Sequence, residues 1–87
     1  MASLRQAIKA AMKDYGEPSK ILEVHETDNH WEITLIPKDF RGDEVSTYPI
    51  FVDKKTGKII DVPMDEFLKT LGKSREVPDS EVMASIE

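Results

Sequence analysis

The residues best suited to chemistry are two histidines, His25 and His30, which flank the dipeptide Asp28-Asn29. This dipeptide favours a turn, and a hairpin formed there brings the two imidazoles close together. Three carboxylates lie close by in the sequence: Glu23, Glu26 and Glu32. Two imidazoles and a carboxylate are a ligand set that Zn²⁺ accepts. Histidines on exposed hairpins are more often solvated, so we expect no metal ligand and no cofactor, and a His₂–carboxylate site is the alternative.

The serines and paired carboxylates do not follow a catalytic pattern. No serine lies in a Gly-x-Ser-x-Gly sequence, which would expose it as a nucleophile. The adjacent acids Asp43/Glu44 and Asp65/Glu66 do not have a spacing that specifies an acid–base pair. The chain has no cysteine and no glycine loop of the phosphate-binding type. We therefore expect no catalytic residues, and a small ligand-binding enzyme is an alternative.

Composition and charge restrict the class of protein. A chain of 87 residues has room for one hydrophobic core. Seventeen acidic and 12 basic residues give a net charge of −5, so we expect no nucleic-acid partner. No apolar run approaches the roughly 20 residues that cross a bilayer, so we expect no membrane partner. The lack of cysteine and of an uninterrupted apolar stretch near the first residue favours a cytoplasmic location.

Residues 3–15 are expected to form an amphipathic helix. Ser3 and Gln6 have the spacing of a capping box, and Gly16 occupies the position where glycine commonly ends a helix. The apolar residues that recur at helical intervals are Leu4, Ile8, Ala11, Met12 and Tyr15. This stripe predicts a helix that covers one face of a sheet.

Four strands are expected after this helix. Their ranges are 20–27, 30–37, 44–53 and 58–62. Short connections between them predict an antiparallel meander. Along the first strand, Leu22 and Val24 are expected to share a face. Along the second, the residues expected to face the core are Trp31, Ile33 and Leu35, while the other sheet face stays partly wet. Pro49 indicates either an edge strand or a position whose amide points outward.

The last third of the chain is expected to contain one short helix and a tail. Apolar residues at helical spacing predict a helix over residues 64–71. Residues 73–87 are polar and predict a flexible tail, in which Asp79 or Ser80 could cap a final turn. The predicted fold class is α+β: one domain over residues 1–72, with the N-terminal helix packed on a four-stranded antiparallel meander.

The hairpin around residues 48–60 resembles the C-terminal hairpin of PepSY-type domains. The motif is Val-Asp-x-x-Thr-Gly-Lys, carried by Val52, Asp53, Thr56, Gly57 and Lys58. Similar hairpins occur in small bacterial toxin-immunity proteins and in gas-vesicle accessory proteins. The resemblance implies an interaction domain that restrains or neutralises another protein. PepSY modules are typically exported, so the cytoplasmic location expected here departs from their pattern.

Together these patterns predict a non-catalytic module that binds another protein, as an inhibitor or immunity-type protein. The partner is expected to contact the exposed face and edge of strand 44–53 and the hairpin tip. The residues predicted to carry this contact are Val45, Thr47, Pro49, Phe51, Lys54 and Lys55. The tail is an accessory, because its apolar residues could dock on a partner or fold back over the sheet; these residues are Val77, Val82, Met83 and Ile86. Sheet edges can also pair with each other. A self-associating structural protein is therefore the alternative, and the chain is a monomer or a homodimer.

Overall fold

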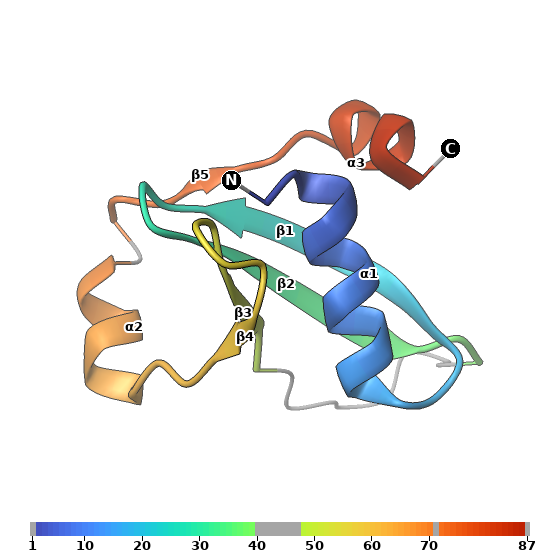
Figure 1. The fold of residues 1–87 in the computed structure, drawn as a ribbon, viewed down its shortest axis with the longest axis horizontal. Helices are drawn as coiled ribbons and strands as arrows, with labels where there is room; N and C mark the ends of the chain where they lie inside the picture. The colour runs from blue at the N-terminus through green and yellow to red at the C-terminus, as the bar shows by residue number, and fades with distance from the viewer. Residues whose placement is uncertain (1, 40–47, 71, 87) are drawn as a thin grey trace.

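The computed structural model describes residues 2–39, 48–70 and 72–86. These residues form an α+β fold in which a long helix lies across one face of an antiparallel sheet (Figure 1). The strands are β1 (Ser19–Glu26), β2 (His30–Pro37), β3 (Ile50–Asp53), β4 (Ile59–Ile60) and β5 (Arg75–Glu76). The helices are α1 (Leu4–Tyr15), α2 (Met64–Thr70) and α3 (Asp79–Ile86). The strand order is β4-β3-β2-β1-β5, so the predicted meander gains a fifth strand beside β1.

Helix α1 forms as predicted because its ends are capped by local signals. The amide of Gln6 donates to Ser3 Oγ at 3.2 Å, and the amide of Ser3 donates to Gln6 Oε1 at 2.9 Å. Gly16 ends the helix with a φ of 78°. The helix places Ala7, Ile8 and Ala11 in the core.

Strand β2 is buried on both faces. Towards α1, Ile33 and Leu35 are buried and Trp31 packs against them, as predicted. The other face was expected to stay partly wet, but it is buried along β2. The residues concerned are His30, Glu32, Thr34 and Ile36. That face is covered at one end by α2, whose Phe67 contacts Phe51 of β3 at 5.6 Å between ring centroids.

A register shift in β1 corrects the predicted pattern of that strand. The β1–β2 pairing passes from Ile21↔Leu35 directly to Glu23↔Thr34. Leu22 is therefore extra in the ladder, as in a β-bulge. The side chain of Leu22 is 53% exposed, while Val24 is fully buried. The two residues predicted to share a face are thus separated by the bulge.

Strand β3 is an interior strand, which overturns the interpretation of Pro49 as a marker of an edge strand. It pairs with β2 on one side and with β4 on the other. Pro49 precedes the first paired residue, Ile50, so its missing amide removes no bond from the described ladder. Residues 44–47 of the predicted strand lie outside the described residues. Strand β4 is shorter than the predicted range 58–62.

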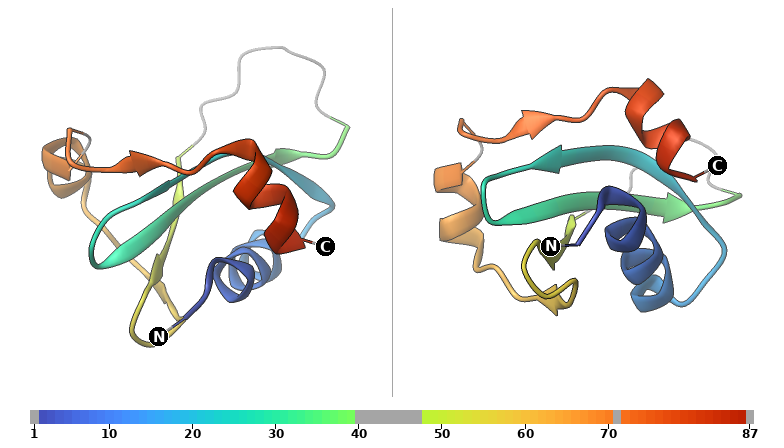
Figure 2. Two further views of the ribbon diagram at one scale, coloured as in Figure 1. Left: turned by 90° about the horizontal axis from the view of Figure 1, so that it is seen from above. Right: turned by 45° about the horizontal axis from the view of Figure 1, so that its top comes forward.

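The segment predicted as a polar tail contributes to the fold. Strand β5 pairs with β1, and α3 packs against α1, as the two views in Figure 2 show. Val77 is 2% exposed and Val82 is 7% exposed, and both belong to the core cluster. The core therefore extends past residue 72, where the domain was expected to end. Within the described residues, no helix is both long and apolar enough to cross a membrane.

Candidate functional site

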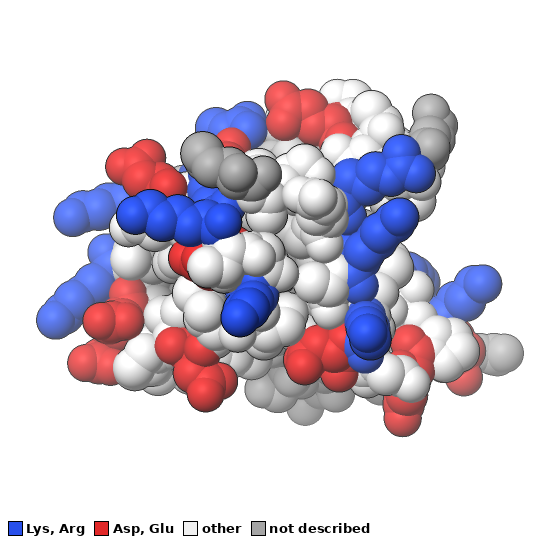
Figure 3. Space-filling model, viewed as in Figure 1, with Lys and Arg blue, Asp and Glu red and all other residues white. Residues whose placement is uncertain are grey.

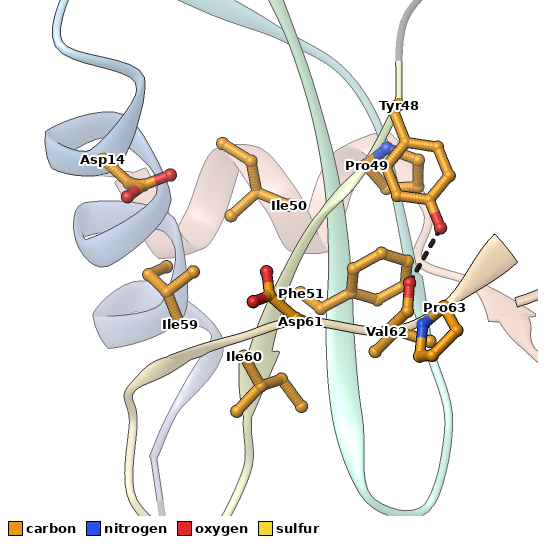
Figure 4. A pocket seen from close by; sticks show the side chains of 10 residues that line it. All are labelled: Asp14, Tyr48, Pro49, Ile50, Phe51, Ile59, Ile60, Asp61, Val62 and Pro63. Atoms are coloured by element: carbon orange, nitrogen blue, oxygen red, sulfur yellow. Dashed lines mark hydrogen bonds between the residues drawn. The ribbon is translucent and has the colours of Figure 1, made fainter. Parts of the chain in front are cut away.

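Of the residues predicted to bind a partner, the four that the structure describes do not form one exposed surface. Val45 and Thr47 lie outside the described residues. Pro49 and Phe51 line a hollow of about 290 Å³ between β3, β4 and the segment that leads to α2 (Figure 4). Phe51 is only 3% exposed, so it offers little area to a partner.

Aromatic packing explains why Phe51 is buried. Its ring makes edge contacts with Tyr48 and Phe67 at centroid distances of 5.6 Å each. The hydroxyl of Tyr48 donates to the carbonyl oxygen of Val62 at 3.0 Å (Figure 4). These contacts fasten α2 to the sheet. The hollow in Figure 4 is mainly apolar, and its acidic side chains are Asp14 and Asp61.

The two predicted lysines have different surroundings. Lys54 Nζ lies 2.9 Å from Glu26 Oε2 and 4.6 Å from the centroid of the Trp31 ring, and its side chain is 13% exposed. Lys54 is therefore engaged within the fold. Lys55 is exposed at the turn of the β3–β4 hairpin.

Among the described residues, the backbone of β1 is unpaired on one side along Ser19–Glu23. Apart from Leu22, which the bulge leaves out of the ladder, residues Ser19–Glu23 pair with β2 on one side. On the other side, β5 pairs with His25 and Glu26, and the amide of Val77 donates to the carbonyl of Val24 at 2.8 Å. Pro78 follows without an amide, and α3 then begins, so this pairing stops. Among the described residues, Ser19–Glu23 has no strand on this side.

An apolar groove accompanies this open edge. Its volume is about 530 Å³, and it lies between β1 and α3. The side chains that give it an apolar surface are Met12, Ile21, Leu22, Val82, Met83 and Ile86. Leu22, Met83 and Ile86 are 53%, 56% and 47% exposed, respectively. We name the edge Ser19–Glu23 and this groove together the β1 edge site.

The sequence indicated the features that make up the β1 edge site, but it did not predict that they lie together beside β1. Open edges and the apolar residues Val82, Met83 and Ile86 were recognisable as binding features. The bulge that exposes Leu22 leaves no signal in the alternation of β1. The turn of the chain at Pro78 follows a two-residue strand, which is too short for periodicity to reveal.

A polar cluster occupies the sheet face that is turned away from α1. His25 Nε2 lies 3.5 Å from Glu23 Oε2, and Glu76 of β5 is the residue opposite His25. His30 is separate from this group, because its Nε2 lies 2.9 Å from Oε2 of the buried Glu32. The structure thus gives the two histidines different carboxylate partners, in contrast to the His₂–carboxylate alternative.

Comparison of the chain with known proteins identifies no similar protein. No protein-family model matches the chain, and neither does any curated protein or solved structure. The resemblance of the Val52–Lys58 hairpin to PepSY-type domains therefore stays a prediction. The class defined by the described residues is a small α+β fold whose antiparallel sheet leaves part of β1 unpaired on one side.

Proposed function

We propose that this protein binds an extended segment of another protein, which adds to the sheet as a strand along Ser19–Glu23. The observation that carries the proposal is the unpaired half of β1, which directly continues the half already paired with β5. Unpaired edges recruit strands because their amides and carbonyls lack partners in the sheet. The role is that of an inhibitor or immunity-type protein, acting by contact and without catalysis.

The groove would give the bound strand specificity, which backbone hydrogen bonds alone do not provide. In strand addition, backbone bonds give affinity, and hollows for alternate side chains give specificity. Leu22, Met83 and Ile86 offer exposed apolar area on the β1 and α3 sides of the groove. An apolar side chain of the added strand would be enclosed between them. The proposed contact surface is therefore β1 with α3, whereas the sequence predicted residues in and around β3.

Charge favours a basic partner. The chain carries a net charge of −5, and Glu23 and Asp79 line the groove. Lys20 is the basic residue that lines it. On the face shown in Figure 3, basic and acidic side chains are interspersed, with a column of basic ones over α1. We therefore expect a segment that alternates apolar residues with lysine or arginine, since opposite charges speed the encounter.

Selection from a displayed library of extended peptides tests this proposal. The immobilised full chain should enrich peptides of the stated pattern, and Leu22→Glu should abolish their binding. Leu68→Glu is the matched control, because Leu68 on α2 is 58% exposed and Leu22 is 53% exposed. When an enriched peptide is bound, NMR should show that backbone amides within Ser19–Glu23 exchange more slowly with solvent than in the free protein. Failure to enrich peptides, or binding that survives Leu22→Glu, would overturn the proposal.

Self-association is the competing outcome at the same edge. Two copies that pair along Ser19–Glu23 would form a homodimer, which light scattering detects as a doubled mass. If wild-type protein is dimeric and Leu22→Glu is monomeric, a second copy is the occupant and the partner proposal is wrong. If both are monomeric, the edge remains open for a partner strand.

A further inference from the structure

We propose that Glu23, His25 and Glu76 form a binding site for a divalent transition-metal ion of the zinc class. The three side chains each offer a ligand atom, and these atoms all lie within 4.8 Å of one another. Glu23 also belongs to the β1 edge site, but the metal proposal does not require a bound peptide, because it depends on the polar sheet face and on the β1–β5 pairing.

Strand pairing places the three residues together. His25 and Glu76 are opposite each other in the β1–β5 ladder. Glu23 precedes His25 by two positions, and residues two apart in a strand share a face. The bulge in β1 lies between Ile21 and Glu23, so it does not disturb this relationship. The backbone positions of all three ligands are therefore fixed by the ladder.

The distances suit a tetrahedral ion. Nitrogen and oxygen ligands lie about 2.0–2.2 Å from Zn²⁺, so neighbouring ligand atoms of a tetrahedral site are about 3.3–3.6 Å apart. His25 Nε2 and Glu23 Oε2 are already 3.5 Å apart. Glu76 is exposed and has a long side chain, so it can close the remaining gap by rotation.

Charge on the two faces of β1 differs. On the α1 side, the carboxylate of Glu26 is bound by Lys54 and Arg75. On the other side, the ion pairs among the described residues give Glu23 the imidazole of His25 and give neither Glu23 nor Glu76 a lysine or arginine. A divalent cation would supply positive charge to this face.

A third acidic side chain lies beside His25. Glu32 of β2 is opposite His25 in the β1–β2 ladder and is 2% exposed. Its Oε2 lies against His30, so it serves as a fixed neighbour and not as a ligand. The site thus combines three candidate ligands at the surface with a buried acidic group beside them.

The ligand types select the metal. Imidazole binds Zn²⁺ and related transition metals well, whereas Mg²⁺ and Ca²⁺ prefer oxygen ligands alone. Three protein ligands leave the fourth tetrahedral position to water or to a donor from another molecule. Bound metal would join β5 to β1 and would hold Glu23 at the end of the β1 edge site.

Titration of Zn²⁺ into the chelator-treated full chain by calorimetry tests the site. We expect one Zn²⁺ per chain at neutral pH, a rise in Tm, and shifted NMR signals from the His25 ring. His25→Ala should abolish binding. Glu76→Gln should weaken it at least about tenfold, because even groups that only support metal ligands contribute about 10–100-fold. Glu17→Gln, an exposed acid before β1, is the control and should bind as wild type.

The variants must fold like the wild type if a loss of Zn²⁺ binding is to be assigned to the lost ligand. The metal-free variants should retain the Tm of the wild type, since His25 and Glu76 contribute no side chain to the hydrophobic core. Mg²⁺ at the same concentration should give no heat. The absence of Zn²⁺ binding would overturn the proposal. Zn²⁺ binding that survives His25→Ala, or equal binding of Mg²⁺, would also overturn it, since both would indicate a non-specific acidic surface.

Discussion

Glu26 of β1 and Arg75 of β5 are opposite each other on adjacent strands, and Arg75 Nε donates a hydrogen bond to Glu26 Oε1 at 2.8 Å. Lys54, just after β3, donates to the second carboxylate oxygen at 2.9 Å. Arg75 also lies 3.4 Å from Glu81 of α3. One carboxylate thus connects β1, the β3–β4 hairpin and β5. Its side chain is 18% exposed, so water screens these bonds only in part.

Replacement of Glu26 by glutamine should destabilise the protein. Glutamine keeps the size of the side chain but removes the charge that two cations share. Hydrogen bonds to charged groups contribute about 1.5–3 kcal/mol each when lost, so we expect a loss of about 1–3 kcal/mol in the free energy of unfolding. Urea denaturation at neutral pH measures this. The exposed Glu17→Gln should change it by less than about 0.5 kcal/mol, and equal effects would contradict the role of Glu26.

The pKa of Glu26 predicts a dependence of stability on pH. Burial by itself would raise this pKa, but the hydrogen bonds and charges of Lys54 and Arg75 outweigh burial and hold it below the ordinary value of 4.5. A carboxyl whose pKa is lower in the folded state stabilises the fold above its unfolded pKa. This contribution is lost as the pH falls through the folded pKa.

Comparison of wild type with Glu26→Gln at several pH values isolates this contribution. The difference in unfolding free energy should be constant above about pH 5 and should shrink steadily below the unfolded pKa of 4.5. Glu17→Gln, whose parent residue is exposed, is the control across the same range. Curves for wild type and Glu26→Gln that stay parallel down to acidic pH would show that Glu26 is not the group responsible.

Sequence reasoning succeeded where structure depends on neighbours along the chain. The capping box joins Ser3 and Gln6, which are three positions apart, and needs no tertiary contact. The β1–β2 hairpin follows from strand alternation on both sides of Asp28-Asn29. Helix α2 follows from apolar spacing and from acids in its first turn. Each of these elements lies within one or two residues of its predicted range.

The fifth strand and the open edge depend on distant contacts, so they could not be predicted in the same way. The bond between Arg75 and Glu26 joins residues 49 positions apart. Residues 75–76 are too few to show alternation. The pairing of β4 with β3 closes the edge on which the sequence placed the partner contact. The structure leaves Ser19–Glu23 of β1 unpaired on one side instead, because β5 ends at Glu76 and the last bond to β1 comes from the amide of Val77, just before Pro78.

Substitution of Gly57 by alanine should weaken the β3–β4 hairpin. Gly57 has a φ of +73°, a conformation that alanine adopts at a cost. Its added methyl carbon would also lie 3.4 Å from the side chain of Ala2. We expect a loss of about 1 kcal/mol in the free energy of unfolding. Gly72→Ala is the matched control, because Gly72 does not have a positive φ and has no atom within 4 Å of an added methyl.

Two adjacent residues of α3 test whether the last segment contributes to the core. Val82 is 7% exposed and Met83 is 56% exposed, so two adjacent positions of one helix offer a buried and an exposed side chain. Val82→Ala should lower the free energy of unfolding by about 1–3 kcal/mol, because it removes two methyl groups from a packed site and leaves a cavity. Met83→Ala should change it by less than about 0.5 kcal/mol. Chemical denaturation of both variants under one set of conditions gives the comparison. Equal and small effects would mean that α3 does not pack on α1 in solution, and the groove beside β1 would then lack its second wall.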